Sequence, residues 1–146
     1  ITEEQFDGIC GVNFKGTFLT LKLAAKHMIR QKRGSIVTVS SMWGQTGGSC
    51  EAVYSATKAA VIGLTKALAK ELGPSGIRVN CVCPGVIDTE MNSNLTDGDV
   101  ATLEEETPLC RIGKPSEVAD LIYYLCSEQS SFVTGQIISA GGGIVI

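Results

Sequence analysis

The sequence predicts an α/β fold in which parallel strands are joined by long helices. Three short runs of mainly aliphatic residues, at 35–40, 77–83 and 136–139, have the length and composition of buried strands. Longer segments with helical periodicity separate these runs, as expected where parallel strands are connected by crossover helices. We therefore expect a parallel sheet flanked by helices, with right-handed connections.

The first helix is expected from Thr2 to about Arg33. Thr2 and Gln5 have the spacing of a capping box, and Gly34 is expected to end the helix. Asn13 lies in the interior, where asparagine is mildly unfavourable, and this favours a functional role over a merely tolerated polar residue. Apolar residues recur at helical spacing along the whole segment: Phe6, Ile9, Phe14, Phe18, Leu21, Ala25 and Met28.

Ser41 follows the strand at 35–40 directly. The carboxyl end of a strand is where open parallel sheets place their ligands, so Ser41 is a candidate site residue. The glycines at 44, 47 and 48 then predict a mobile or tightly turned loop.

The second long helix, from about Glu51 to Leu72, carries the central motif of the chain. Tyr54 and Lys58 stand four residues apart, which places both side chains on one face, about 6 Å apart along the helix axis. Taken alone, such a pair usually decorates a solvated helix face. Gly73-Pro74 is expected to end the helix.

A phenol beside an ammonium group can serve as an acid and base. A free phenol has a pKa of about 10, and ionising it near neutral pH requires roughly 4 kcal/mol. One positive charge at roughly 5 Å, in an effective dielectric of about 20, supplies about 3 kcal/mol. Lys58 is therefore predicted to make the Tyr54 hydroxyl acidic, and the Ser41 hydroxyl is predicted to hydrogen-bond the oxygen that Tyr54 protonates.

The last third of the chain is less regular. Pro84-Gly85 ends the strand at 77–83, and Thr89 follows as either a ligand-binding residue or a helix cap. Residues 90–113 mix apolar and acidic side chains and are expected to be less regular than the rest of the chain. A short helix is expected from Pro115 to about Ser127, before the strand at 136–139.

Composition limits the class of protein. The chain has 146 residues, with 44% hydrophobic and 18% charged, which fits one globular domain. A net charge of −3 gives no indication of nucleic-acid binding. No apolar run is long enough to span a bilayer and no signal peptide is visible, so a cytoplasmic protein without membrane contact is expected.

Six cysteines are present, without a CxxC pair. Cys81 and Cys83 flank one residue of an expected strand and therefore point to the same face. Buried thiols are expected here rather than a disulfide or a metal site.

Several motifs together resemble the short-chain dehydrogenase/reductase family, and its 3-oxoacyl-[acyl-carrier-protein] reductase branch in particular. They are Asn13 in GVNFKGTF, Ser41 in TVSSMWG, Tyr54 and Lys58 in YSATKAA, and Asn80 with Pro84-Gly85 in RVNCVCPGVIDTEM. The resemblance implies the C-terminal part of a Rossmann-like doubly wound parallel sheet. The family's TGxxxGxG turn and NNAG segment do not occur in the chain. Residues 1–146 are thus expected to be the C-terminal catalytic portion of a single domain.

The resemblance also implies roles for particular residues. It makes Tyr54 the general acid, Lys58 its activator and a ligand of the nicotinamide ribose, and Ser41 the residue that stabilises the oxyanion. Asn13 would mark a kink in the first helix, where its carbonyl would hold a water molecule that links Lys58 to solvent. The cofactor, NADP in preference to NAD, would be bound by Tyr54, Lys58, Pro84, Gly85, Val86, Ile87 and Thr89. No metal is implied.

The implied reaction is reduction of a carbonyl to an alcohol, with the 3-oxoacyl thioesters of fatty acid biosynthesis as the family's usual substrates. The loop SMWGQTGGSCE, with Trp43 and Glu51, is similar to relatives that reduce an aminopentanone group on elongation factor P. Carrier-dependent members are basic near the end of the second helix, where this chain has Gly73-Pro74-Ser75-Gly76, and this difference weakens the interpretation of a carrier-bound substrate, which stays only narrowly ahead. A third alternative is an inert fragment or assembly subunit that binds no cofactor.

The resemblance further implies a homo-oligomer, a dimer or a tetramer, in which the two long helices pack against a neighbouring subunit. The strand at 35–40 would present a bare hydrophobic edge in this chain, and we expect a missing partner segment or a rearranged dimer to cover it.

Overall fold

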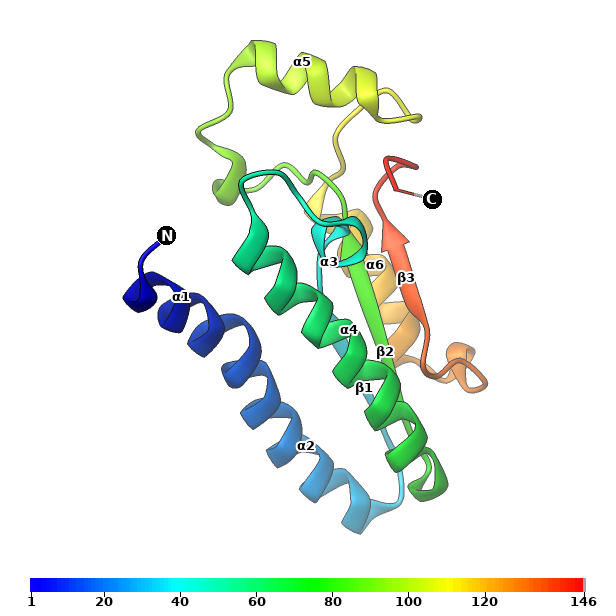
Figure 1. The fold of residues 1–146 in the computed structure, drawn as a ribbon. Helices are drawn as coiled ribbons and strands as arrows, with labels where there is room; N and C mark the ends of the chain where they lie inside the picture. The colour runs from blue at the N-terminus through cyan, green and yellow to red at the C-terminus, as the bar shows by residue number, and fades with distance from the viewer. Residues whose placement is uncertain (146) are drawn as a thin grey trace.

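The computed structural model describes residues 1–145 and contains a parallel sheet with helices on both faces (Figure 1). Its strands are β1 (Gly34–Val39), β2 (Ile77–Pro84) and β3 (Ile137–Ala140), in the order β1-β2-β3. Both strand pairs are parallel. Each strand lies within one residue of its predicted range, so the predicted strands are confirmed.

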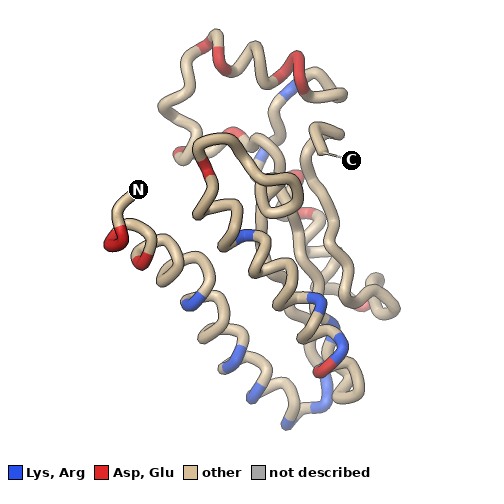
Figure 2. The backbone as a smooth tube through the Cα atoms, viewed as in Figure 1, with Lys and Arg blue, Asp and Glu red and all other residues tan. Residues whose placement is uncertain are grey.

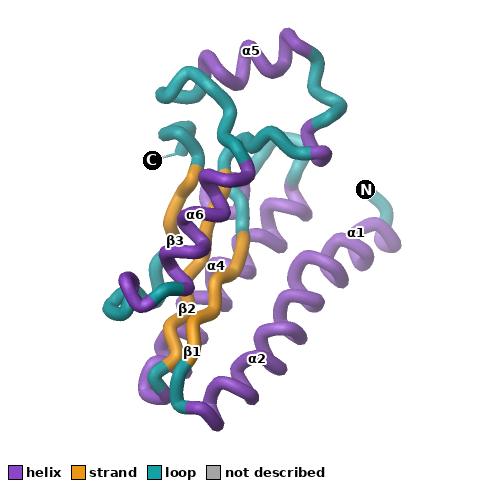
Figure 3. Tube along the Cα trace, turned by 180° about the vertical axis from the view of Figure 1, so that it is seen from behind, coloured by secondary structure: helices purple, strands orange, loops and turns teal. Residues whose placement is uncertain are grey.

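Helix α4 (Ala52–Leu72) covers one face of the sheet, and α6 (Pro115–Cys126) covers the other (Figures 1 and 3). Beside α4 lies one long helical rod made of α1 (Glu3–Cys10), the π-helical segment η1 (Gly11–Gly16) and α2 (Thr17–Gln31). A compact core joins α2, α4 and the sheet: Leu21, Ile36, Ala69, Leu72, Ile77 and Val79.

The long helix expected from Thr2 to about Arg33 is present, and its backbone is π-helical at η1, around Asn13, where the resemblance implied a kink. The Thr17 hydroxyl donates to the Asn13 carbonyl over 2.7 Å. The Thr2–Gln5 capping box is confirmed. The rod ends at Gln31 because Lys32 adopts a left-handed conformation with φ 51°, so Gly34 begins β1 instead of ending the helix.

The glycine loop after Ser41 is partly helical, contrary to expectation, and forms α3 (Met42–Thr46). Gly44 lies inside this helix, where a Cβ atom would come within 2.5 Å of the Ser40 Oγ and 2.9 Å of the Lys58 backbone carbon. The glycine therefore permits α3 to pack directly on α4.

Two further segments are more regular than the sequence suggests. After α4 the chain forms a 3-10 turn, η2 (Gly73–Ser75), and Gly76 takes the left-handed conformation, with φ 73°, instead of Gly73. Within residues 90–113 lie η3 (Glu90–Asn92) and α5 (Asp97–Glu106), which Thr96 and Asp99 cap reciprocally. One more 3-10 turn, η4 (Glu128–Ser130), follows α6.

Charge is distributed unevenly over the fold. Most Lys and Arg residues gather near the end of α2 and the start of the strands, and most Asp and Glu residues lie toward the opposite end, around α5 and the start of α1 (Figure 2). The carboxyl ends of the strands thus face the acidic end. Among the described residues, no helix has both the length and the apolar character needed to cross a bilayer.

Candidate active site

The carboxyl ends of β1 and β2 and the first half of α4 enclose a cleft of about 360 Å³. It brings together seven of the predicted site residues: Ser41, Tyr54, Lys58, Pro84, Gly85, Ile87 and Thr89. Val86 lines an adjoining cleft of about 440 Å³, which shares Ser41, Tyr54 and Gly85 with the first. Asn13 lines neither cleft and lies on η1, in the helical rod beside α4.

Tyr54 and Lys58 lie together on α4, as their spacing predicts. The Lys58 Nζ is 5.5 Å from the centroid of the Tyr54 ring and donates to the Val39 carbonyl of β1 over 3.3 Å. An ammonium group has three donors, so two remain for a ligand in the cleft. Burial lowers the pKa of Lys58, and Cys81 and Cys83 act in the opposite direction.

Ser41 is held by its place at the start of α3. It is the N-cap residue of that helix, and its Oγ accepts a hydrogen bond from the Trp43 amide over 3.2 Å. In this bond the Ser41 oxygen is the acceptor, so the hydrogen of the Ser41 hydroxyl stays available for donation to a ligand. Ser41 is buried and faces both clefts with Tyr54.

Asn13 is connected to Tyr54 through a buried threonine. The Asn13 Nδ2 donates to the Thr57 Oγ1 over 3.2 Å, and that hydroxyl donates to the Tyr54 backbone carbonyl over 2.7 Å. Thr57 is 4% exposed, so this link excludes water. It fixes the π-helical segment against the turn of α4 that carries Tyr54.

The segment after Pro84 forms one wall of the cleft. Gly85 packs on the C-terminal glycines, where a Cβ atom would lie 2.7 Å from the Gly141 Cα. The next residues are held by Gly113, whose amide donates to the Val86 carbonyl over 2.9 Å. Thr89 precedes η3 without a capping bond from its side chain, so its alternative role as a helix cap is not realised.

Sequence reasoning missed Asn92. Its Nδ2 donates to the Ile87 carbonyl over 2.7 Å, and its side chain lines both clefts beside Met91. No spacing or periodicity in the sequence predicts Asn92 as a site residue, because it follows an irregular segment and is held in place by one local contact with the backbone.

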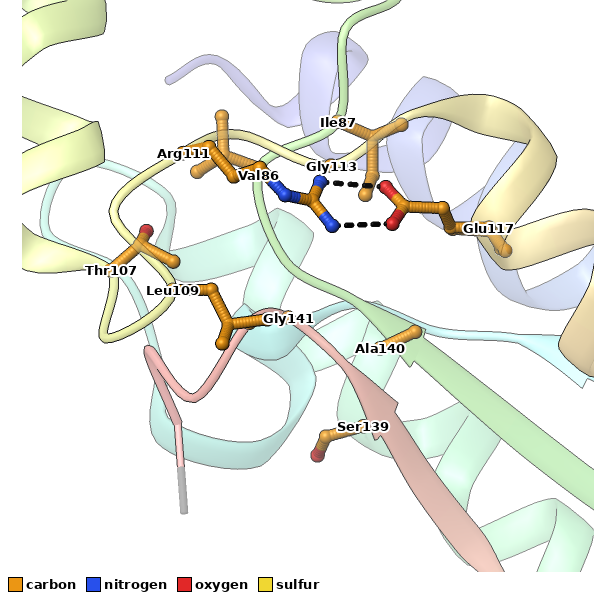
Figure 4. A pocket seen from close by; sticks show the side chains of 12 residues that line it. Val86, Ile87, Thr107, Leu109, Arg111, Gly113, Glu117, Ser139, Ala140 and Gly141 are labelled. Atoms are coloured by element: carbon orange, nitrogen blue, oxygen red, sulfur yellow. Dashed lines mark hydrogen bonds and ion pairs between the residues drawn. The ribbon is translucent and has the colours of Figure 1, made fainter.

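A smaller cavity, of about 200 Å³, lies behind the wall formed by Val86 and Ile87 (Figure 4). Arg111 and Glu117 form a bidentate ion pair at its rim, with 2.8 Å between Nη1 and Oε2. The pair lowers the pKa of Glu117 to about 2. Neither Tyr54 nor Lys58 reaches this cavity.

Metal-ligating side chains do not cluster in the structure. Within residues 1–145 there is no group of three or more His, Cys, Asp or Glu side chains that would hold an ion. The clefts are instead lined by hydroxyl, ammonium and backbone groups, which suit an organic ligand.

A family model described as enoyl-(acyl carrier protein) reductase matches residues 1–145. Together with the cleft and the parallel sheet, this match shows that the chain belongs to the short-chain dehydrogenase/reductase family of oxidoreductases. The expected fold, the C-terminal part of a Rossmann-like doubly wound sheet, is confirmed.

Two curated relatives illustrate the similarity. The 3-oxoacyl-[acyl-carrier-protein] reductase of Thermotoga maritima is 47% identical over 99% of this chain and 58% of its own length. An oxidoreductase of Bacillus subtilis described as uncharacterized is 51% identical over 80% of this chain and 48% of its own length. The chain therefore spans about half the length of these relatives.

Two solved structures superpose closely. A gluconate 5-dehydrogenase from Burkholderia cenocepacia, in complex with NADP and tartrate, gives a TM-score of 0.95 at 31% identity, over 99% of this chain and 57% of its own. A 3-oxoacyl-[acyl-carrier protein] reductase from Brucella melitensis with bound NAD gives a TM-score of 0.87 at 42% identity, over 98% of this chain and 53% of its own.

Proposed function

We propose that the protein is an NAD(P)-dependent oxidoreductase that reduces a carbonyl group to an alcohol. One observation carries the proposal: Ser41, Tyr54 and Lys58 share one cleft, with the lysine nitrogen 5.5 Å from the tyrosine ring. Two elements separate in sequence, the start of α3 and the first half of α4, must fold together to bring a hydroxyl, a phenol and an ammonium group to this one place.

In the proposed reaction, the Tyr54 hydroxyl gives its proton to the carbonyl oxygen of the substrate while that oxygen gains negative charge. The positive charge of Lys58 stabilises the phenolate that remains. Ser41 donates a hydrogen bond to the same substrate oxygen, which spreads the developing charge over two donors. A bound nicotinamide cofactor supplies the hydride that adds to the carbonyl carbon.

The residues present suit a nicotinamide cofactor. The two free donors of Lys58 would bind ribose hydroxyls, and Thr89 would offer a hydroxyl at the far end of the cleft. The backbone of Pro84, Gly85, Val86 and Ile87 would hold the nicotinamide end, because glycine packing keeps this segment at the cleft wall. NADP is proposed as the slightly preferred cofactor. Of the two similar solved structures, one contains NADP and the other contains NAD.

Asn13 is proposed to hold a water molecule with its carbonyl and so connect Lys58 to solvent. The π-helical turn supports this role, since such turns often occur at functional sites and leave carbonyls outside the regular ladder. The Thr17 hydroxyl already donates to this carbonyl, and the oxygen has a second lone pair for water.

The preferred substrate class is a 3-oxoacyl thioester carried by acyl carrier protein. Several relatives are 3-oxoacyl-[acyl-carrier-protein] reductases, among them that of Thermotoga maritima, and they support this substrate class.

A second candidate keeps the chemistry and changes the substrate to a carbonyl that bears an amino group, such as aminopentanone on elongation factor P. Glu51 supports it, because this exposed carboxylate lines the cleft beside Tyr54 and Trp43 and forms no ion pair within residues 1–145. Glu51→Gln would weaken reduction of the amino substrate about tenfold or more and leave a neutral acyl thioester nearly unaffected.

We further propose that the chain supplies the catalytic portion of one domain in a cytoplasmic homo-oligomer. Apolar side chains exposed on the long rod would pack against a second copy: Phe6, Phe14, Phe18, Leu19 and Leu23. Sedimentation at two concentrations tests this, and a persistent monomer would contradict it.

The first experiment is a titration of this chain, and of the protein at its full natural length, with NADPH and NADH. Fluorescence of the reduced nicotinamide reports binding, and its oxidation after addition of a 3-oxoacyl thioester reports turnover. Saturable binding with turnover supports the proposal. No binding by either protein would favour the alternative of an inert assembly subunit.

A further inference from the structure

Ser40 is a buried residue beside the cleft that the proposed reaction does not use. It lies between the end of β1 and Ser41, and its side chain is 3% exposed. Its amide donates to the Val82 carbonyl of β2 over 2.8 Å, which continues the pairing of the sheet and fixes the Ser40 backbone. A residue held in this way next to the site is able to position its neighbours.

The hydroxyl of Ser40 bonds to α4. It donates to the backbone carbonyl of Lys58 over 2.8 Å. Inside a regular helix each carbonyl already accepts from the amide four residues further on, so the Ser40 bond is additional to those of the helix itself. A bond of this kind restrains the sliding and the rotation of the helix against the strand. It acts on the very residue of α4 that carries the ammonium group.

Lys58 makes a second contact with the same strand end. Its Nζ donates to the Val39 carbonyl over 3.3 Å. The two ends of Lys58, its backbone carbonyl and its ammonium group, thus bond to consecutive residues of the chain, Ser40 and Val39. The next residue is Ser41, which lines the cleft together with Lys58. The end of β1 therefore sets the positions of Lys58 and Ser41 relative to each other.

Helix α3 meets β1 and α4 at the Ser40 hydroxyl. A Cβ atom on Gly44 of α3 would come within 2.5 Å of the Ser40 Oγ and 2.9 Å of the Lys58 backbone carbon. Ser41 is the N-cap residue of α3, and Lys58 belongs to α4. The Ser40 hydroxyl thus lies at the contact between the two helices that hold the site residues in place.

A second buried hydroxyl contact joins the same two elements without touching the site. The Oγ1 atoms of Thr38 on β1 and Thr65 on α4 are 2.7 Å apart, and both side chains are buried. Thr65 lies about two helical turns beyond Lys58, and neither threonine lines the clefts. Without the Thr65 hydroxyl, Thr38 would still have the Asn80 carbonyl as an acceptor, over 3.3 Å. Thr65 therefore offers a matched control for Ser40.

We propose that Ser40 is a positioning residue of the reaction: its hydroxyl fixes the turn of α4 that carries Lys58 and so keeps the ammonium group over the Tyr54 ring. The lysine nitrogen lies 5.5 Å from the ring centroid. Misplacement of a catalytic group by about 1 Å costs up to about a hundredfold in rate. The inference rests on the proposed function, because it requires Lys58 and Tyr54 to act together in proton transfer.

The test replaces Ser40 by alanine in the protein at its full natural length. Ser40→Ala removes the hydroxyl and keeps a small side chain at a buried position. Thr65→Val is the control, because it also removes one buried hydroxyl contact between β1 and α4. Circular dichroism and urea denaturation compare the fold and the stability of the two variants.

The first readout needs neither substrate nor turnover. In the NMR spectrum the ε-protons of Lys58 experience the ring current of Tyr54, because the lysine nitrogen lies over the ring. Their signals, assigned by their loss in Lys58→Met, should move toward the values of an exposed lysine in Ser40→Ala and stay in place in Thr65→Val. Signals that already match an exposed lysine in the wild type, or that respond equally to both variants, overturn the inference.

The second readout is a double-mutant cycle on kcat at saturating cofactor. Ser40→Ala should lower kcat about tenfold in the wild type, and less than about twofold in a Lys58→Met background, where no ammonium group remains to be positioned. Thr65→Val should change kcat less than about twofold in both backgrounds. A loss from Ser40→Ala of similar size in both backgrounds would mark a general structural effect and would overturn the inference.

The two readouts keep this inference distinct from the proposed function. Should the full-length protein reduce no carbonyl, the proposed function fails, while the NMR comparison still decides whether Ser40 positions Lys58. An active protein in which Ser40→Ala leaves the Lys58 signals and kcat unchanged would keep the proposed function and refute the role of Ser40.

Discussion

Replacement of Lys58 by methionine removes the positive charge beside Tyr54 and keeps most of the side-chain volume. The Lys58 nitrogen lies 5.5 Å from the centroid of the tyrosine ring. With the phenolate charge placed at the ring centre and an effective dielectric of about 20, the two unit charges attract each other by about 3 kcal/mol. If the phenolate forms in the transition state, the loss corresponds to roughly a hundredfold in rate.

The assay is kcat for carbonyl reduction at saturating cofactor, so that weaker ribose binding does not enter the comparison. Lys66→Met is the matched control, because Lys66 is exposed on the same helix and lines neither cleft. We expect a loss of about a hundredfold for Lys58→Met and less than about twofold for the control. A folded Lys58→Met variant that keeps more than a third of the wild-type kcat would refute the electrostatic reasoning.

Three further predictions follow from the contacts around the cleft. Thr57→Val removes the hydroxyl that links Asn13 to Tyr54 and should lower kcat about three- to tenfold. Thr57→Ser keeps a hydroxyl and should retain the wild-type kcat. Equal kcat values for the wild type and both variants would argue against the link. Gly44→Ala places a Cβ atom 2.9 Å from the Lys58 backbone and should lower the free energy of unfolding by about 1–3 kcal/mol. Gly63→Ala has open space around it and should leave the free energy of unfolding unchanged. Urea denaturation measures both values. Arg111 lowers the pKa of Glu117 to about 2, so its stabilising contribution is present above the ordinary value of 4.5 and is lost as the pH falls toward 2. The difference in melting temperature between wild type and Glu117→Gln should therefore be constant from pH 7 to 5 and shrink below 4.5; a constant difference down to pH 2 would contradict this.

The elements that the sequence predicted well are those with strong periodic patterns. All three strands and α4 have the expected ranges within one residue, because aliphatic runs and a long alanine-rich helix leave few alternatives. The meeting of Ser41 with Tyr54 and Lys58 was also predictable, since a strand end and a helical spacing of four residues place them.

The elements that the sequence missed depend on tertiary contacts. The resemblance implied a kink at Asn13, but no local pattern reveals the hydrogen bond from its side chain to Thr57, forty-four residues away. The glycines at 44 and 47 suggested a loop, yet Gly44 is helical because α3 packs closely on α4. Asn92 became visible only through its contact with the Ile87 carbonyl.

The most direct measurement is the single-turnover rate of carbonyl reduction by the Tyr54→Phe variant with reduced cofactor already bound. Phenylalanine retains the ring beside Lys58 and lacks only the hydroxyl that is proposed to give up its proton. The account predicts a rate about a thousandfold below wild type, with the fold and the cofactor affinity intact. A rate within tenfold of wild type would show that the proton comes from another group and would contradict the proposed role of Tyr54.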